Sequence, residues 1–468
     1  MVLTSFNHIL RKNGSRWARF VRQIGAENLL IVGVDAAKYV HKAMICSFYG
    51  DIFIRPFEFD ASESGFRKLV SKINEVKANQ GTCEVVLGVE ATGHYYEDIV
   101  LRSQASGFHV RVLNAVITAQ ERKYLLNRSK TDNLDLMVIV NAVISGRGTD
   151  SPLPTGSVHD LRKLTRARRE LVNRRTAVQN SIRVHADHIF REFQGKYIWK
   201  NGKKEFVKPL SDFFGKASRY IMRHCLHPSD ILALGDKGLR ELSVKENLKL
   251  RDSSIQRLLK FAEDSISRPK EEVEIEQYLL NHQLDLLDLL DGQIKELERR
   301  IEDLFVQTEG AVILSVPGIG VITGAELYAE MGDISDFDHA GQLIKMAGTN
   351  PVVKQSGDRK PSFMSISKQG RRPFRNVVFL IGKSLSQNNP EMNVKYNEFR
   401  NRGKYPRQAY IALGNRMIRM AFSMIKNQSL YRTNHKYYDL NHEITKKLRN
   451  PNVKLFYESF VKPSSIVA

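Results

Sequence analysis

Hydrophobic positions divide the chain into an N-terminal part with short apolar runs and a later part with helical periodicity. Five runs between positions 29 and 115 predict strands: LLIVGVDAAK, HKAMICSFYG, IFIRPFEF, CEVVLGVE and FHVRVLNA. The second and third can pair with the first as a meander. Between the runs, SESGFRKLVSKINEVKA has helical spacing and opens with a serine where a cap is expected. The pattern predicts an α/β domain over 29–150, and the Pro- and Gly-containing SPLPTGS at 151–157 predicts a linker.

Two long helices are predicted after the linker. The first covers 158–184, and its apolar positions fall near one stripe. The second covers 272–306, where leucine or isoleucine recurs every seven residues at 280, 287, 294 and 301. This repeat predicts a coiled-coil seam that closes either within one chain or between two, and we expect a dimer. Residues 158–306 are therefore predicted to form a basic helical and coiled-coil region, with an uninterpreted insert at about 190–270.

Charge and composition point to a polyanionic partner. The 468 residues suffice for two or three domains, and they carry a net charge of +21 with a sequence pI of about 9.7. Nucleic acid is the expected partner, and an anionic membrane surface is the alternative. Because no apolar run approaches the roughly 18 residues of a membrane span, we expect a cytoplasmic, nucleoid-associated protein without a membrane partner. The three cysteines form no pattern typical of a disulfide framework or a zinc site.

Basic side chains of the first long helix are candidate nucleic-acid contacts, although a solvated helix face is the alternative. These candidates are Arg162, Arg166, Arg168, Arg169, Arg174 and Arg175. In VPGIG, backbone N–H groups at Gly318 and Gly320 can hold a phosphate if the turn is a helix-hairpin-helix motif, and a plain helix corner is the alternative. Lysine and arginine also outnumber acids late in the chain, including a basic tail at 431–468.

Four acids stand where a metal site is expected. Asp35 and Glu90 end predicted strands, and Asp132 and Asp135 lie three apart near a helix start, so these two share a face. Neighbouring carboxylates repel unless a cation lies between them, and hard oxygen ligands suit Mg²⁺, with Mn²⁺ as a possible substitute. We expect a two-metal site that acts on a phosphodiester. Taken singly, each acid is typical of a strand-end turn or a helix cap.

The order of these acids in GVDAAK, VEATGHYYE and KTDNLD resembles the RuvC-like (RNase H fold) domain of DEDD insertion-sequence transposases of the IS110 type, which have Piv-type DNA invertases as relatives. The segments VPGIGVITGAEL, MAGTNPVVKQSGDRK and SISKQGRRPFRNVVF resemble the transposase domain of the same family. The resemblance covers about 29–150 and 308–430. It implies an α/β RuvC-like domain, a helical coiled-coil middle and a mainly α C-terminal domain.

The resemblance also implies a catalytic serine and a set of partners. Ser356 in KQSGDRK matches the family's nucleophile, which cuts and rejoins DNA through a 5′-phosphoserine link. Basic residues nearby, which we expect to hold phosphates, are Lys368, Arg371, Arg372 and Arg375. Family members are guided by a structured bridge RNA that pairs with donor and target DNA, and they assemble as homodimers or homotetramers. The alternatives are a metal-dependent, junction-resolvase-like nuclease, a Piv-type invertase and a non-catalytic nucleic-acid-binding protein.

Overall fold

The computed structural model describes residues 14–82, 84–91, 93–124, 132–149, 153, 156–352 and 365–432. It divides the chain into two compact units, Met1–Thr155 and Gly156–Ala468. Ser356 and almost all of the basic tail lie outside the described residues.

The first unit contains a five-stranded mixed sheet with the order β3-β2-β1-β4-β5. Its strands are β1 Leu29–Asp35, β2 Val40–Ser47, β3 Ile52–Asp60, β4 Glu84–Glu90 and β5 His109–Leu113. β1, β2 and β3 form the predicted antiparallel meander, whereas β4 runs parallel to β1 and β5 parallel to β4. The five predicted strands are therefore all present, in a single sheet.

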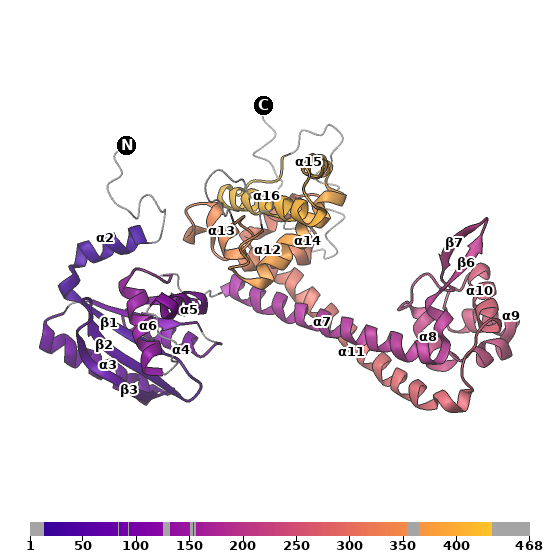
Figure 1. The fold of residues 1–468 in the computed structure, drawn as a ribbon, viewed down its shortest axis with the longest axis horizontal. Helices are drawn as coiled ribbons and strands as arrows, with labels where there is room; N and C mark the ends of the chain where they lie inside the picture. The colour runs from indigo at the N-terminus through magenta and orange to yellow at the C-terminus, as the bar shows by residue number, and fades with distance from the viewer. Residues whose placement is uncertain are drawn as a thin grey trace. The chain divides into compact units, whose positions relative to one another are not determined.

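Helices cover both faces of this sheet (Figure 1). They are α2 Gly14–Ile24, the short turn η1 Ala26–Asn28, α3 Glu63–Gln80, α4 Tyr96–Ala105, α5 Ala115–Tyr124 and α6 Asp132–Ile144. Apolar side chains of α3 and α4 share one core with the sheet, and those of α2, α5 and α6 share the other. The predicted cap of α3 is confirmed, since the Ser62 side chain accepts a hydrogen bond from the Gly65 N–H at 3.2 Å.

The second unit is built on two long antiparallel helices, α7 Gly156–Phe190 and α11 Glu274–Phe305. Arg168 of α7 pairs with Glu298 of α11, and Arg175 pairs with Asp291, so the numbering rises along one helix as it falls along the other. The four heptad positions 280, 287, 294 and 301 are all buried. Toward both ends of α11, these buried residues belong to the same cores as residues of α7. The sequence did not decide whether the seam packs within one chain or between two, and in the structure it packs within one chain.

One end of these helices carries the insert, which forms a separate core (Figure 1). Its elements are η2 Arg191–Gln194, β6 Lys196–Lys200, β7 Lys203–Val207, α8 Lys216–His224, α9 Pro228–Lys245, α10 Asp252–Glu263 and η3 Lys270–Val273. β6 and β7 form an antiparallel hairpin. The sequence analysis left 190–270 uninterpreted, although Tyr197, Ile198 and Trp199 are consecutive β-prone residues and Asn201-Gly202 is a turn signal between the two strands.

The other end packs against the C-terminal helices. These elements are η4 Glu309–Ser315, α12 Val321–Met331, η5 Ile334–Asp336, α13 Ala340–Ala347, α14 Arg372–Asn388, α15 Pro390–Asn401 and α16 Pro406–Asn427. Leu161 of α7 and Ile301 and Phe305 of α11 belong to the same buried core as these helices. The long helices and the predicted 308–430 domain thus share a core. None of the helices in the described ranges has the length and apolarity to cross a bilayer.

Candidate functional site

Asp35 and Glu90 end two neighbouring parallel strands. β1 pairs with β4 up to Val34 opposite Val89, one residue before each acid. Paired strands lie about 4.8 Å apart. The register therefore brings these two predicted site residues next to each other at one edge of the sheet.

The two acids also start from the same face of the sheet. Side chains alternate between faces along a strand, so Asp35 shares its face with Ile31, and Glu90 shares its face with Val86. Ile31 and Val86 both belong to the core that contains α6. The two carboxylates consequently lie on the α6 side of the sheet.

Helix α6 approaches the sheet closely because two glycines lie beneath it. A Cβ atom on Gly33 would be 3.2 Å from the Leu136 carbonyl oxygen, and one on Gly88 would be 2.3 Å from Cγ2 of Val143. Leu136 follows Asp135 directly, and Gly33 lies two residues before Asp35. The glycines thus allow α6 to bring its first turns, which carry Asp132 and Asp135, toward the end of β1.

Asp135 has a cationic partner. Arg122 of α5 donates from Nη2 to Oδ1 of Asp135, and the two side chains are 24% and 14% exposed. The side chain of Asp132 lies outside the described part of the structure. Among the side chains that are described, no three histidine, cysteine, aspartate or glutamate groups are close enough together to hold a metal ion. The four-acid metal site therefore stays a prediction.

A small depression of about 320 Å³ lies near the same end of β1. Its lining includes His41, His94, Tyr95 and Asp98, which the sequence analysis did not single out. The depression is on the opposite face from the acids, because its walls come from α3 and α4. Burial lowers the pKa of His41, and the Asp98 charge partly offsets this effect. The sequence signal for His94, Tyr95 and Asp98 was the aromatic and charged segment HYYED at 94–98, a few residues after Glu90.

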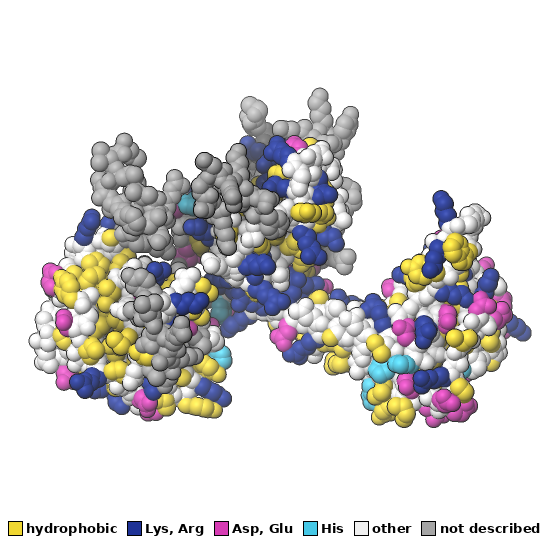
Figure 2. Space-filling view, viewed as in Figure 1, with side chains coloured by type: hydrophobic (Ala, Val, Ile, Leu, Met, Phe, Trp, Pro, Cys, Tyr) yellow, Lys and Arg dark blue, Asp and Glu magenta, His cyan; other side chains and the backbone are white. Residues whose placement is uncertain are grey.

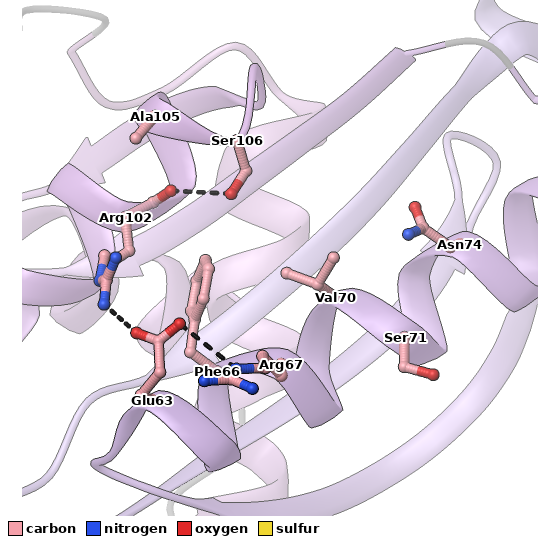
Figure 3. A pocket seen from close by; sticks show the side chains of 9 residues that line it. All are labelled: Glu63, Phe66, Arg67, Val70, Ser71, Asn74, Arg102, Ala105 and Ser106. Atoms are coloured by element: carbon pink, nitrogen blue, oxygen red, sulfur yellow. Dashed lines mark hydrogen bonds and ion pairs between the residues drawn. The ribbon is translucent and has the colours of Figure 1, made fainter.

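A larger cavity, of about 600 Å³, lies between α3 and α4 (Figure 3). Glu63 forms ion pairs there with Arg67 and Arg102. None of the predicted site residues lines this cavity.

Acids from other helices pair with most of the predicted nucleic-acid-binding arginines of α7. Arg166 donates to Glu330 through two nitrogens, and Arg169 forms a similar pair with Glu326. Arg162 donates to the Ala329 carbonyl oxygen at 2.8 Å. The sequence showed few acids near these arginines because their partners are more than one hundred positions away.

The arginines on the rest of α7 differ in their exposure. Arg168 and Arg175 pair with Glu298 and Asp291 of α11 and are partly buried. Arg174 pairs with Glu170, one turn away on the same helix, and both side chains are 64% exposed. Nucleic-acid contact by these six arginines stays a prediction, and Arg174 is the most accessible of the paired set.

The predicted helix-hairpin-helix turn joins η4, a 3-10 segment, to the start of α12. Gly318 adopts a φ of +85°, which favours glycine, and its carbonyl oxygen accepts a hydrogen bond from Ser384 at 2.6 Å. Gly320 precedes α12, is exposed and provides no side-chain cap. Gly320 itself lies at the surface, whereas Val321, Ile322 and Thr323 are half-buried, and phosphate contact at this turn stays a prediction.

The segment that contains Ser356 is anchored at both described ends. Pro351 forms a bridge with Ile366, and the Ser367 hydroxyl donates to Asn350 Oδ1 at 2.6 Å. Just before these residues, the Thr349 hydroxyl contacts Oδ1 of Asn415 at 2.5 Å. The two ends of the segment are therefore held together on the second unit.

The four basic residues after this segment have different surroundings. Arg375 donates to the carbonyl oxygens of Ala347, Lys368 and Gly370, and Arg371 donates to the carbonyl oxygen of Glu330. Lys368 and Arg372 are exposed. Arg371 and Arg375 thus have roles in the fold, whereas Lys368 and Arg372 present their charges at the surface.

Two family models match the chain, and both describe transposases. One, for DEDD transposases of the IS110 type, matches residues 32–191, which include both strand-end acids and all of the sheet except the first three residues of β1. The other, described as transposase IS116/IS110/IS902 family, matches residues 310–397. The fold and the comparisons thus place the chain among the transposases.

Individual proteins are also similar to this chain. The mini-circle putative transposase for IS117 of Streptomyces coelicolor is 26% identical over 82% of this chain and 91% of its own length. The IS900 uncharacterized 42 kDa protein of Mycobacterium paratuberculosis is 33% identical over 30% of this chain and 36% of its own length. The pilin gene-inverting protein of Moraxella bovis is 26% identical over 31% of this chain and 45% of its own length. The chain belongs to the IS110 family of transposases.

Proposed function

We propose that this protein is a DNA recombinase that cuts and rejoins strands to move its own mobile element. The strongest support is the placement of Asp35 and Glu90 at adjacent parallel strand ends, on the face covered by α6. The strand order β3-β2-β1-β4-β5, with β1 in the middle, supports a RuvC-like (RNase H) fold for the first unit. Acids at such an edge are suited to phosphodiester chemistry.

The donor set fits a divalent cation. Asp35, Glu90, Asp132 and Asp135 would hold Mg²⁺, or Mn²⁺ in its place, because hard oxygen ligands are what these ions prefer. When bound, the ion would polarise the phosphodiester and stabilise the charge of the transferring phosphate. Arg122 contributes by holding the Asp135 carboxylate in position. Its guanidinium would have to share that carboxylate with the ion.

Ser356 would be the nucleophile. Its hydroxyl oxygen attacks the phosphorus, the new Oγ–P bond forms, the P–O3′ bond breaks, and the serine proton ends on the departing 3′-hydroxyl. The phosphate stays on the 5′ end as a phosphoserine, and attack by another strand's 3′-hydroxyl reverses the step. The hydrogen bond between Ser367 and Asn350 supports the proposal, because it fixes the described residues on either side of the segment that carries Ser356.

The proposed partners are donor DNA, target DNA and a structured bridge RNA that pairs with both. Lys368, Arg372 and Arg174 are exposed cations suited to phosphate contacts. We further propose a homodimer or homotetramer, in which the serine of one protomer acts with the acids of another. An exposed apolar row on α11 supports this assembly: Ile275, Tyr278, Leu279, Leu286 and Leu289.

A nicked suicide DNA substrate tests the proposal. The wild type should form a covalent adduct that mass spectrometry maps to Ser356, and Ser356→Ala should bind DNA normally but form none. Ser365→Ala, at an exposed serine just beyond the segment, is the matched control and should form the adduct at the wild-type rate. Efficient cutting by Ser356→Ala would instead favour the metal-dependent nuclease.

The acids are tested in the same assay. Asp35→Asn, Glu90→Gln, Asp132→Asn and Asp135→Asn should each reduce adduct formation by at least a hundredfold without unfolding the protein. Glu75→Gln is the control, because Glu75 is an exposed acid on α3, on the other face of the sheet. Wild-type rates in any two of the four variants would contradict the metal site.

The similarity to the pilin gene-inverting protein favours site-specific inversion as a second candidate outcome, which the arrangement of the product strands would reveal.

A further inference from the structure

The hairpin β6–β7 carries exposed aromatic rings and lysines together. Tyr197, Trp199 and Phe206 are 62%, 75% and 46% exposed. Lysines at 196, 200, 203, 204 and 208 lie in or beside the hairpin, which has one acid, Glu205. Figure 2 shows hydrophobic and basic side chains side by side where Figure 1 labels these strands. The proposed catalytic residues include none from this hairpin.

Local geometry holds the hairpin in a defined shape. Asn201 and Gly202 have φ values of 51° and 72°, which is typical of the tight turn that matches strand twist. At the base, Lys196 pairs with Asp264 at 2.8 Å and lies 4.6 Å from the centre of the Phe261 ring. Val207 packs against the core of the insert. The hairpin is therefore anchored on its helices at one end and exposed at the other.

The strand register separates two faces. Tyr197 pairs with Phe206, and Trp199 pairs with Lys204, so these four side chains share one face. The anchoring residues Lys196 and Val207 are paired on the opposite face. The aromatic face consequently points away from the helices that support the hairpin.

Packing within the hairpin accounts for part of this face. The rings of Tyr197 and Phe206 lie 5.0 Å apart at 62°, and Lys204 Nζ lies 4.6 Å from the centre of the Tyr197 ring. Such cross-strand contacts stabilise a hairpin. Trp199 stands outside this ring pair and is the most exposed of the three aromatic residues. Hairpin stability alone does not explain a large indole at that position.

We propose that the exposed end of the hairpin binds single-stranded nucleic acid, with Trp199 stacking on an unpaired base and with Lys204 and the two lysines that flank the turn, Lys200 and Lys203, contacting phosphates. The occupant follows from charge complementarity, because four exposed lysines, at 200, 203, 204 and 208, outnumber the single acid Glu205, whereas Lys196 is paired with Asp264. It follows also from the aromatic rings, because an unpaired base presents its flat face whereas a duplex hides it. This proposal adds a binding site to the proposed function. It rests on the proposed function only for the class of partner, which is nucleic acid. RNA and single-stranded DNA share the chemistry that it recognises.

Intrinsic fluorescence of the full-length protein tests the site. The chain has two tryptophans, and Trp17 is 6% exposed, so the exposed indole of Trp199 should report stacking. Titration with 16-nucleotide oligo(U) and oligo(dT) should quench the emission. The oligonucleotide that binds more tightly shows whether RNA or single-stranded DNA is the preferred ligand. A blunt 16-base-pair duplex should quench much less, and equal quenching by the duplex would overturn base stacking.

Variants separate the indole from the lysines. Trp199→Ala should weaken oligonucleotide binding about tenfold, measured by anisotropy of a labelled strand, whereas Trp199→Phe should bind nearly normally without the quench. Joint alanine substitution of Lys200, Lys203 and Lys204 should lower the slope of log affinity against log salt by about two units. The matched control replaces the exposed lysines of the neighbouring helices: Lys237, Lys245 and Lys260.

Several results would overturn the site. Unchanged affinity in Trp199→Ala is one, and equal effects of the two lysine triples is another. Binding is measured here without strand exchange, so its failure leaves the adduct assay unaffected. If the wild type formed no adduct at Ser356, the result of this binding test would likewise be unaffected.

Discussion

Arg166 and Glu330 form a two-point ion pair between α7 and α12. Arg166 Nε lies 2.7 Å from Glu330 Oε1, and Arg166 Nη2 lies 3.0 Å from Glu330 Oε2. The Glu330 side chain is 1% exposed, whereas that of Arg166 is 46% exposed. The pair thus gives a buried carboxylate its cationic partner and fixes α12 against the long helix.

Removal of Arg166 should destabilise the second unit. Arg166→Ala leaves the Glu330 charge buried without this partner, and we expect the free energy of unfolding to fall by roughly 3 kcal/mol in urea denaturation. Adding Glu330→Gln should recover part of the loss, because the buried charge is then gone. Arg174→Ala, at an exposed pair, should change the free energy of unfolding by less than about 0.5 kcal/mol. Equal effects of the two alanine variants would contradict the importance of burial.

Gly88 should be required for the position of α6. Gly88→Ala places a methyl group against Val143, which should lower the free energy of unfolding by about 1–3 kcal/mol and reduce adduct formation. Val143→Ala in the same chain makes room for the methyl group. The double variant should therefore be more stable than the sum of the two single effects predicts. Simple additivity in thermal or urea denaturation would show that the two side chains do not meet.

Substitution of an exposed arginine of α7 should affect RNA binding, whereas substitution of a partly buried one should affect stability. Arg174→Gln should lower the slope of log affinity for RNA against log salt by nearly one unit and leave the melting temperature unchanged. Arg169→Gln should lower the melting temperature, because it removes the partner of Glu326. Burial raises the pKa of Glu326, and the hydrogen bond and charge of Arg169 oppose that rise. Filter-binding titrations with an unchanged slope for Arg174→Gln would make that arginine a solvated surface residue.

Two buried cysteines should be slow to react. Burial, with a smaller contribution from Asp51, raises the pKa of the Cys46 thiol to about 12, and burial together with Asp230 raises that of Cys225 to about 11. In a Cys83→Ser variant, neither thiol should react with Ellman's reagent at pH 8 until denaturant is added. Because both folded pKa values are raised, the stability that these thiols contribute is complete below about pH 9. It should fall as the pH rises through 11 and 12. Rapid reaction of the native protein with the reagent would contradict the burial of these two thiols.

The sequence alone was sufficient for the five strands and for the acids at the ends of two of them. Apolar runs, alternation and the Ser62 cap are local signals, and strands and caps depend mainly on neighbouring residues. Asp35 and Glu90 could be placed at strand ends for the same reason. Their adjacency required the register of β1 with β4, which no single segment contains.

Only the tertiary structure decided what the charges do. The acids that pair with Arg166 and Arg169 come from α12, more than one hundred and fifty residues further along the chain. A sequence pattern shows which charges are close along the chain, whereas ion pairs depend on which helices pack together. The anchor of the hairpin around Trp199 is likewise distant in sequence, because Lys196 at its base pairs with Asp264, the residue after α10. Pairing between distant elements, rather than local propensity, therefore determined which basic residues are exposed.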